Sequence, residues 1–217
     1  MTMDPLLIYC YDAYCGWCYG FSPVISRLAR QYADRLRVEV LSGGMILTQP
    51  ARPISVMAGY ILQAYPVVEQ RTGIHFGEDF LWHIRNPGES DWFPSSEKPA
   101  IALCVFREFH PHRQVEFAAD LQAALHAEGR DLCDDEAYRH LLEKYAIPDT
   151  LFYERLHDPS YKQLAYNEFT LVGRLGVRGF PAVLLQVSES RFYRIAEGYT
   201  DYATLQSGLE QALEAAS

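Results

Sequence analysis

The chain has 217 residues, of which 28 are acidic and 19 are Lys or Arg, so its formal net charge is −9. Hydrophobic residues make up 49% of the sequence and charged residues 22%. These values are typical of a soluble globular protein and exclude disordered, collagen-like and coiled-coil chains. The acidic balance argues against a nucleic-acid-binding protein, which normally has a basic face. The length suits one large domain, or a small domain with an insertion.

The amino-terminal segment does not have the pattern of a signal peptide. Asp4 precedes the apolar run, whereas a signal peptide begins with a basic region that a longer apolar stretch follows. No segment approaches the roughly 20 apolar residues of a membrane span. We therefore expect a soluble, cytoplasmic protein with neither a membrane nor a nucleic acid as its partner.

The first 44 residues predict a strand, a helix and a second strand. Residues 5–11 are apolar throughout, which is typical of a short strand buried on both faces. Apolar side chains at helical spacing follow, and Pro23 should kink this helix. Residues 36–41 mostly alternate between apolar and polar, as in a strand, and Gly43-Gly44 ends it. This order implies a parallel pair of strands with a right-handed crossover.

Between residues 45 and 175 the pattern is almost wholly helical. Residues 76–97 are the unclear stretch, because Pro and Gly break it, and we expect a loop there. Strand patterns return at Ala182–Val187, with Phe192–Glu197 as the hairpin partner, and Asp201 caps a last helix. The helices expected in the middle of the chain are 54–70, 98–109, 113–128, 134–145, 149–156 and 160–175.

The two ends of the chain therefore carry the strands, and the middle carries the helices. We predict an α/β fold with one parallel sheet built from both ends and an all-helical domain inserted between them. Residues 1–44 and 158–217 would form the sheet domain, and residues 45–157 the inserted helical domain.

The sequence Cys15-Gly16-Trp17-Cys18 stands apart from the three other cysteines. It lies where a strand gives way to a helix, and backbone N–H groups and the helix dipole stabilise a thiolate at that point. We expect Cys15 to be exposed at the start of the helix. Cys18, one turn deeper, could attack a mixed disulfide. The pair thus has the two properties that thiol–disulfide exchange needs.

Two other interpretations of this pair stay open. Zinc sites use the same spacing, but zinc needs a second ligand pair, which neither Cys104, Cys133 nor the scattered histidines supply. The pair could also be incidental to the structure. We expect a redox pair with no metal and no cofactor. Cys10 and Cys104 should be core thiols, and acidic neighbours disfavour a thiolate at Cys133.

A second motif, Gly176–Pro181, lies directly before the third predicted strand. Taken alone, this motif indicates an ordinary loop before a strand. The loop must turn within four residues, and cis peptide bonds belong essentially to X–Pro. We therefore expect the Phe180–Pro181 bond to be cis and to face Cys15 and Cys18.

Together, the two motifs resemble those of the thioredoxin superfamily, and within it the DsbA-like proteins with an inserted helical domain. Residues 15–23 resemble the active-site helix of that superfamily, and residues 176–181 its cis-proline loop. Residues 127–169 resemble the helical insert of the FrnE-like branch, whose members are predicted disulfide isomerases. The similarity covers nearly the whole chain. DsbA itself differs, because it carries a histidine between its cysteines and a signal peptide.

This resemblance implies a thioredoxin fold and a dithiol–disulfide oxidoreductase or isomerase. The substrates would be thiol- or disulfide-bearing proteins or peptides, and an unidentified redox partner would exchange electrons with the pair. Cys15 would be the attacking cysteine, and Cys18 the buried resolving cysteine. The backbone of Phe180 would pair with a bound peptide. The residues at the substrate would be Trp17, Gly179, Phe180 and Pro181.

Other roles are compatible with the same fold. One is a protease adaptor, as in the YjbH-like branch, in which docking matters more than redox turnover. Another is a glutathione-dependent isomerase of the 2-hydroxychromene-2-carboxylate type, whose members generally have serine at the position of Cys15. The intact Cys15–Cys18 pair favours the oxidoreductase. Asp12, three residues before Cys15, is either a proton relay for the buried thiol or a turn residue.

Overall fold

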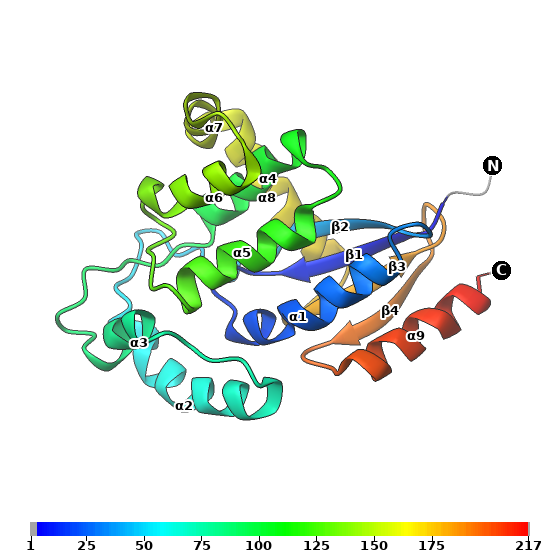
Figure 1. Cartoon of the computed structure of the whole chain (residues 1–217), viewed down its shortest axis with the longest axis horizontal. Coiled ribbons are helices and arrows are strands. Elements are labelled where there is room, and N and C mark those ends of the chain that lie inside the picture. Colours follow the sequence, from blue (N-terminus) through cyan, green and yellow to red (C-terminus); the bar gives the residue numbers. More distant parts are fainter. Residues whose placement is uncertain (1–3, 217) are drawn as a thin grey trace.

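The computed structural model describes residues 4–216, in which four strands form one mixed sheet (Figure 1). The strand order is β2-β1-β3-β4. β1 and β2 are parallel, whereas β3 is antiparallel to both β1 and β4. Both ends of the chain thus build the sheet, as predicted. The strands are β1 (Leu6–Tyr11), β2 (Arg37–Ser42), β3 (Ala182–Gln186) and β4 (Phe192–Glu197).

The expectation of a parallel sheet is wrong for the pairing of β1 with β3. Cys10 lies opposite Ala182 and Leu6 lies opposite Gln186, so the start of β3 lies beside the end of β1. In a parallel pair these two points would lie at opposite ends of the sheet. The loop before β3 therefore meets the turn after β1 because the two strands are antiparallel.

Helices cover both faces of the sheet (Figure 1). α1 (Gly16–Gln31) and α9 (Tyr202–Glu214) pack on one face, and α8 (Pro159–Arg174) packs on the other. Successive strand residues point to opposite faces. Tyr9 accordingly belongs to the large core under α1 and α9, and Cys10 to a smaller core against α8.

The middle of the chain is helical, as predicted. α2 and α3 pack against each other, and α2 also contacts α1 (Figure 1). α4 contacts α5, α7 and α8. None of the helices in residues 4–216 combines the length and the apolar composition needed to cross a membrane. The bounds are α2 (Ser55–Thr72), α3 (Glu78–Arg85), α4 (Glu97–Phe109), α5 (Gln114–His126), α6 (Arg139–Tyr145) and α7 (Asp149–Leu156).

Two helix predictions need correction. Residues 76–97 are not all loop, because α3 occupies 78–85. The helix-breaking residues of this stretch follow α3, and Phe80, Leu81 and Ile84 are buried at helical spacing. The single helix expected over 134–145 is divided into a 3₁₀ turn, η1 (Asp135–Tyr138), and α6.

The sheet and the inserted helices share one core. A single cluster of buried residues contains Leu7 and Phe21 from the sheet part as well as Phe106 and Phe117 from the helical part. The boundaries at residues 44 and 158 therefore stay a proposal about topology. They do not separate two hydrophobic cores.

Side chains from the helices cap the outer edge of β2. Gln114 accepts a hydrogen bond from the Val40 N–H at 3.1 Å, and Arg107 donates to the Val40 carbonyl at 2.8 Å. Glu168 accepts from the Ser42 N–H at 3.0 Å and pairs with Arg107 at 2.6 Å. These contacts fix α4, α5 and α8 against the edge of the sheet.

Candidate functional site

Cys15 is the N-cap residue of α1. Its N–H donates to the Asp12 carbonyl at 3.1 Å, which closes the turn after β1. Its Sγ accepts a hydrogen bond from the Cys18 N–H at 3.2 Å. The sulfur thus occupies the position that a capping side-chain oxygen takes in an ordinary helix. The positive end of the helix favours a negative charge on a sulfur placed there.

Cys15 is more buried than the sequence indicates. Its exposed fraction is 6%, and that of Cys18 is 0%. The expectation of an exposed Cys15 is wrong because the loop before β3 closes over it, and Cys15 Sγ donates to the Phe180 carbonyl at 3.6 Å. Only a small part of the Cys15 residue is therefore exposed to a substrate.

The loop that covers Cys15 is the second motif of the sequence. Its Phe180–Pro181 bond is cis, as predicted. The Pro181 carbonyl accepts a hydrogen bond from the Gly198 N–H at 2.7 Å, which ties the loop to the end of β4. Cys15 and Phe180 are 165 positions apart in the chain. The two motifs therefore form one site across the start of β3.

The two cysteines have different environments. Burial raises the pKa of the Cys18 thiol well above its ordinary value, and the adjacent Cys15 raises it further. Cys18 therefore keeps its proton at neutral pH. Cys15 has the helix N-terminus and the Cys18 N–H at its sulfur. This asymmetry favours Cys15 as the sulfur that attacks first.

Asp12 is buried beneath the cysteine pair, and its carboxylate accepts hydrogen bonds from three segments of the chain. Its Oδ1 accepts hydrogen bonds from the Tyr14 N–H at 3.0 Å and the Ser96 hydroxyl at 2.9 Å, and its Oδ2 accepts from the Met45 N–H at 2.7 Å. Burial raises the pKa of this carboxyl, and the hydrogen bonds oppose the rise. These contacts are those of a turn residue. The proton-relay role of Asp12 stays a prediction.

The other residues predicted to meet the substrate lie around the cysteine pair. Trp17 is half-buried, and its ring centroid lies 6.1 Å from that of Tyr199. Tyr199 directly follows Gly198, which binds the Pro181 carbonyl. Gly179 is also half-buried. Trp17 therefore lies on the same side of the site as the cis-proline loop.

Sequence reasoning missed an aromatic wall that the helical region supplies. Phe76 lies over Gly16, where an added Cβ would be 3.3 Å from the Phe76 Cζ. His126 stacks on Tyr19 with ring centroids 5.1 Å apart, and it meets Phe76 edge-on at 5.3 Å. Burial lowers the pKa of His126 to about 3. No local pattern marks these residues, because their contacts join distant parts of the chain.

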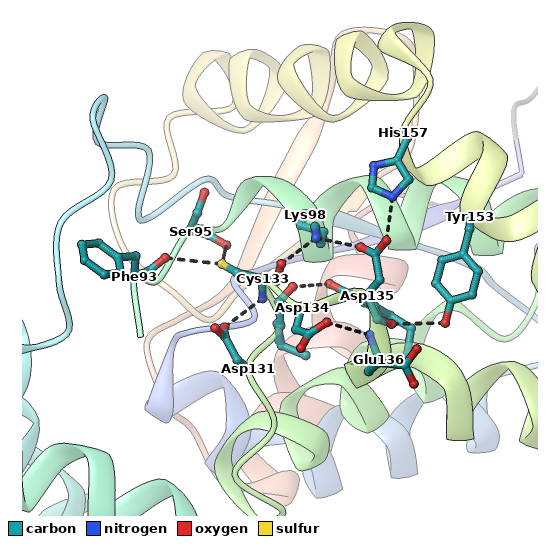
Figure 2. A network of polar contacts seen from close by, with 12 residues as sticks. Phe93, Ser95, Lys98, Asp131, Cys133, Asp134, Asp135, Glu136, Tyr153 and His157 are labelled. Atoms are coloured by element: carbon teal, nitrogen blue, oxygen red, sulfur yellow. Dashed lines mark hydrogen bonds and ion pairs between the residues drawn. The ribbon is translucent and has the colours of Figure 1, made fainter. Parts of the chain in front are cut away.

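Cys133 contacts Tyr14, the residue before Cys15, and it lies within a polar network of its own (Figure 2). Its Sγ is 3.4 Å from the Tyr14 hydroxyl and donates to the Phe93 carbonyl at 3.5 Å. Lys98 donates to the Cys133 carbonyl at 2.5 Å and pairs with Asp135 at 2.7 Å. Burial is the main cause that raises the pKa of the Cys133 thiol. The prediction that Cys133 does not form a thiolate is therefore confirmed. Its main cause is burial, and the negative charge of Asp131 contributes less.

The remaining cysteines are core thiols, as expected. Cys10 and Cys104 are both buried, and burial raises the pKa of Cys10 to about 12. Cys104 donates to Glu168 at 3.4 Å. Within residues 4–216, no group of three or more His, Cys, Asp or Glu residues is placed to hold a metal ion.

The geometry of the two motifs agrees with a comparison of the sequence with protein families. The family described as the DSBA-like thioredoxin domain matches residues 7–210. The chain belongs to the DSBA-like thioredoxin domain family. Its members are generally thiol–disulfide oxidoreductases. The mixed four-stranded sheet and the inserted helices of residues 4–216 agree with the fold of this family. A search of curated protein sequences finds no match.

Solved structures share the fold of this DSBA-like protein. A candidate protein disulfide isomerase from Nitrosomonas europaea has a TM-score of 0.84 at 24% identity, and the match covers 98% of this chain and 99% of that one. The cytosolic disulfide reductase DsbM from Pseudomonas aeruginosa has a TM-score of 0.76 at 24% identity, with 97% and 99% covered. A structure of DsbM with glutathione has a TM-score of 0.73 at 24% identity, with 96% and 99% covered.

A fourth similar structure is that of a 2-hydroxychromene-2-carboxylate isomerase. It has a TM-score of 0.63 at 12% identity, and the match covers 97% of this chain and 95% of that one. At 24% identity or less, all four matches show that the structures share a fold with this DSBA-like protein.

Proposed function

We propose that this DSBA-like protein is a dithiol–disulfide oxidoreductase that acts on proteins or peptides through Cys15 and Cys18. One observation carries the proposal. The Cys15 sulfur caps α1 by accepting the Cys18 N–H, and the Phe180 carbonyl faces the same sulfur. A nucleophilic sulfur with a resolving thiol one turn away is what disulfide exchange requires, and the Phe180 carbonyl beside Cys15 gives a bound peptide a backbone group to meet.

In the reducing direction, the Cys15 thiolate attacks one sulfur of the substrate disulfide. A mixed disulfide forms, and the other substrate sulfur leaves as a thiolate and takes up a proton. Cys18 then loses its proton and attacks the Cys15 sulfur, so the substrate departs as a dithiol. The Cys15 and Cys18 thiols have together given up two electrons and become a disulfide, and an external thiol reductant then reduces this disulfide back to the dithiol. If a second substrate thiol attacks before Cys18 does, the result is isomerisation.

Cys18 has to lose its proton within a buried site. The Asp12 carboxyl interacts electrostatically with Cys18, and burial raises the pKa of that carboxyl. We therefore include Asp12 in the proposal as the group that accepts the Cys18 proton. The substrate backbone would lie along Phe180, with Trp17, Gly179 and Pro181 around it.

The redox partner in this proposal is a glutathione-type thiol, and the location is the cytoplasm. Two molecules of glutathione supply the two electrons that reduce the Cys15–Cys18 disulfide, and they leave as glutathione disulfide. The likeness to the cytosolic disulfide reductase DsbM, which has a structure with glutathione, supports both parts.

Trapping of the mixed disulfide tests the proposed function. The Cys18→Ala protein should accumulate a covalent complex with a disulfide-bearing peptide, because the resolving step is missing. The Cys15→Ser protein should form none and should not reduce insulin. Cys133→Ser, combined with Cys18→Ala, is the matched control, and it should trap as well as Cys18→Ala alone. Turnover by Cys15→Ser would show that the assignment is wrong.

An adaptor is the second candidate function, and an exposed face of α2 favours it. Val56, Tyr60 and Val67 lie on this face, and Tyr60 is 70% exposed. An adaptor would act without its thiols. The Cys15→Ser, Cys18→Ser double variant would then replace the wild-type protein in cells, whereas Tyr60→Asp would not. The opposite result is expected for the oxidoreductase.

A further inference from the structure

Gly43 directly follows β2 and lies beside the turn that leads to Cys15. Its N–H donates to the Tyr11 carbonyl at 2.7 Å, so it extends the ladder between β1 and β2 by one residue. From the sequence alone, Gly43-Gly44 serves only to end the strand. The structure gives both glycines close neighbours.

The ring of Phe180 occupies the space where a side chain of residue 43 would lie. A Cβ added to Gly43 would be 2.0 Å from the Phe180 Cζ, 2.4 Å from its Cε1 and 2.7 Å from its Cε2. Carbon atoms in contact are normally about 3.5–4.0 Å apart. The whole outer half of the ring would therefore have to move if residue 43 were not glycine.

Gly44 receives a second aromatic ring in the same way. Its φ is +66°, in the left-handed region that glycine adopts most easily. A Cβ there would be 2.8 Å from the Phe169 Cγ, which belongs to α8. At the end of β2, the rings of Phe180 and Phe169 thus occupy the space that side chains at positions 43 and 44 would fill. Phe180 belongs to the loop that covers the redox pair.

The ring of Phe180 and the carbonyl that meets Cys15 belong to the same residue. The ring packs against the cores on both faces of the sheet, so its position is set from several sides. The carbonyl lies 3.6 Å from the Cys15 Sγ, and the next residue is Pro181. A displaced ring would turn this carbonyl away from the sulfur, or would lift the loop.

We infer that Gly43 is a positioning residue for disulfide exchange, because its missing side chain lets Phe180 hold its carbonyl against Cys15. The inference rests on the proposed function and adds to it a residue that touches neither cysteine. It predicts that Gly43 acts through Phe180 and through no other neighbour.

A double-mutant cycle tests this link. The variants are Gly43→Ala, Phe180→Ala and the combination of both, each assayed for kcat/KM with a disulfide-bearing peptide. Gly43→Ala should lower kcat/KM by about 10- to 100-fold, since misplacement by about 1 Å costs that much in a preorganised site. In the Phe180→Ala background, the same change should cost almost nothing because no ring is left to displace.

Gly59 supplies the matched control. It lies within α2, and apart from its chain neighbours and the backbone of the same helix, no described atom lies within 4 Å of the Cβ that alanine would add. Gly59→Ala should leave kcat/KM unchanged. An unchanged kcat/KM in Gly43→Ala would overturn the inference. So would a loss of equal size with and without the Phe180 ring, because Gly43 would then act through another neighbour.

The cycle remains informative if a variant folds badly. If Gly43→Ala unfolds and the double variant folds, as judged by circular dichroism, the clash with the ring is demonstrated. If neither folds, Phe180→Ala alone has to lower kcat/KM, and wild-type efficiency in that protein would overturn the inference.

Failure of the proposed function would be visible separately. If the wild-type protein reduced no disulfide, the rate at which iodoacetamide alkylates Cys15 would replace kcat/KM in the same cycle, read by intact mass. Gly43→Ala should then react faster than the wild type, because Phe180 no longer covers the sulfur, and the two Phe180→Ala proteins should react alike. Equal rates in Gly43→Ala and the wild type would overturn the inference.

Discussion

The Ser96 hydroxyl donates to Asp12 Oδ1 over 2.9 Å, and it accepts from the Ile46 N–H at 3.0 Å. Ser96 directly precedes α4, whereas Asp12 lies in the turn before Cys15. This pair therefore joins the inserted helices to the redox site. With the bond from the Met45 N–H to Asp12 Oδ2, it ties two distant segments, one at residues 45–46 and one at Ser96, to one buried carboxyl.

Asp12→Asn should destabilise the protein by about 1–3 kcal/mol, the cost of leaving a buried donor unpaired. An amide NH₂ would face the N–H of Met45 in place of a carboxylate oxygen. Urea denaturation measures the change in the free energy of unfolding. Asp34→Asn, at an exposed position, is the control and should have no measurable effect. Equal stability of the two variants would mean that the Asp12 contacts contribute nothing.

The same variant tests whether Asp12 accepts the Cys18 proton. As a base, Asp12 has to be ionised, so the rate at which Cys18 resolves a preformed mixed disulfide should rise with pH through the raised pKa of Asp12. Asp12→Asn should lose this rise. If both proteins showed the same pH profile in stopped-flow measurements, Asp12 would be a structural residue alone.

The reduction potential of the Cys15–Cys18 pair should lie nearer the −270 mV of thioredoxin than the −120 mV of DsbA. Gly16-Trp17 places no cationic side chain between the cysteines, and a cation there would stabilise the thiolate. Equilibration with glutathione buffers, followed by alkylation and mass measurement, gives the potential. Since about 30 mV corresponds to 1.4 kcal/mol, a value near −120 mV would require several kcal/mol of additional thiolate stabilisation.

Substitution at Gly16 provides the matched comparison. Gly16→His adds a cationic group and should raise the potential, whereas Gly16→Ala adds only the Cβ that approaches Phe76 at 3.3 Å. The difference between the two variants isolates the charge from the crowding. Equal potentials would show that charge between the cysteines does not set the redox poise here.

His126 should make the protein sensitive to acid. Burial lowers its pKa from 6.5 to about 3, so the folded protein binds fewer protons than the unfolded chain between these values. The stabilising contribution of the neutral His126 is therefore full above about pH 6.5 and falls as the pH drops toward 3, by up to about 5 kcal/mol. His126→Phe should keep the stacking on Tyr19 and remove this loss.

Urea denaturation at several pH values between 3 and 7 checks this prediction. The His126 ring interacts with the backbone of Ala13, which opposes the lowering of its pKa, and phenylalanine removes this contact together with the titrating group. His112→Gln, at an exposed position, should retain the acid sensitivity of the wild type. A His126→Phe protein that lost stability in acid as steeply as the wild type would contradict the explanation.

The Arg107–Glu168 pair should contribute more to stability than any surface ion pair. Glu168→Gln should cost about 3 kcal/mol, because it leaves a largely buried guanidinium without its counter-charge. Glu78→Gln breaks the exposed pair with Arg85 and should cost less than about 1 kcal/mol. Thermal unfolding of both variants measures the difference. Similar losses would show that the pair beside β2 is no stronger than a surface contact.

Local patterns predict much of this fold. The apolar run of residues 5–11 and the helical spacing after Cys15 correspond to β1 and α1, and Asp201 caps α9 through the Thr204 N–H. Such features depend on neighbours within a few positions. The direction of β3 does not, because an apolar strand has the same pattern in parallel and antiparallel sheets.

The same distinction applies to the site. The Cys15–Cys18 pair and Pro181 could be found from spacing and residue type. The burial of Cys15, the wall that includes Phe76 and the seat that Gly43 provides could not, since each depends on a contact between distant segments. Gly43-Gly44 did carry a signal, because two adjacent glycines at the end of a strand leave room for a neighbour.

The caps on the outer edge of β2 mean that the sheet part cannot be cut free of the inserted helices. A chain without residues 45–157 would lack Arg107 and Gln114 and would leave the backbone of Val40 bare. A bare edge strand is a template for pairing with other chains. The inserted helices therefore prevent β2 from pairing with a strand of another chain. In the described part of the chain, β4 is left as the edge at which another strand could add.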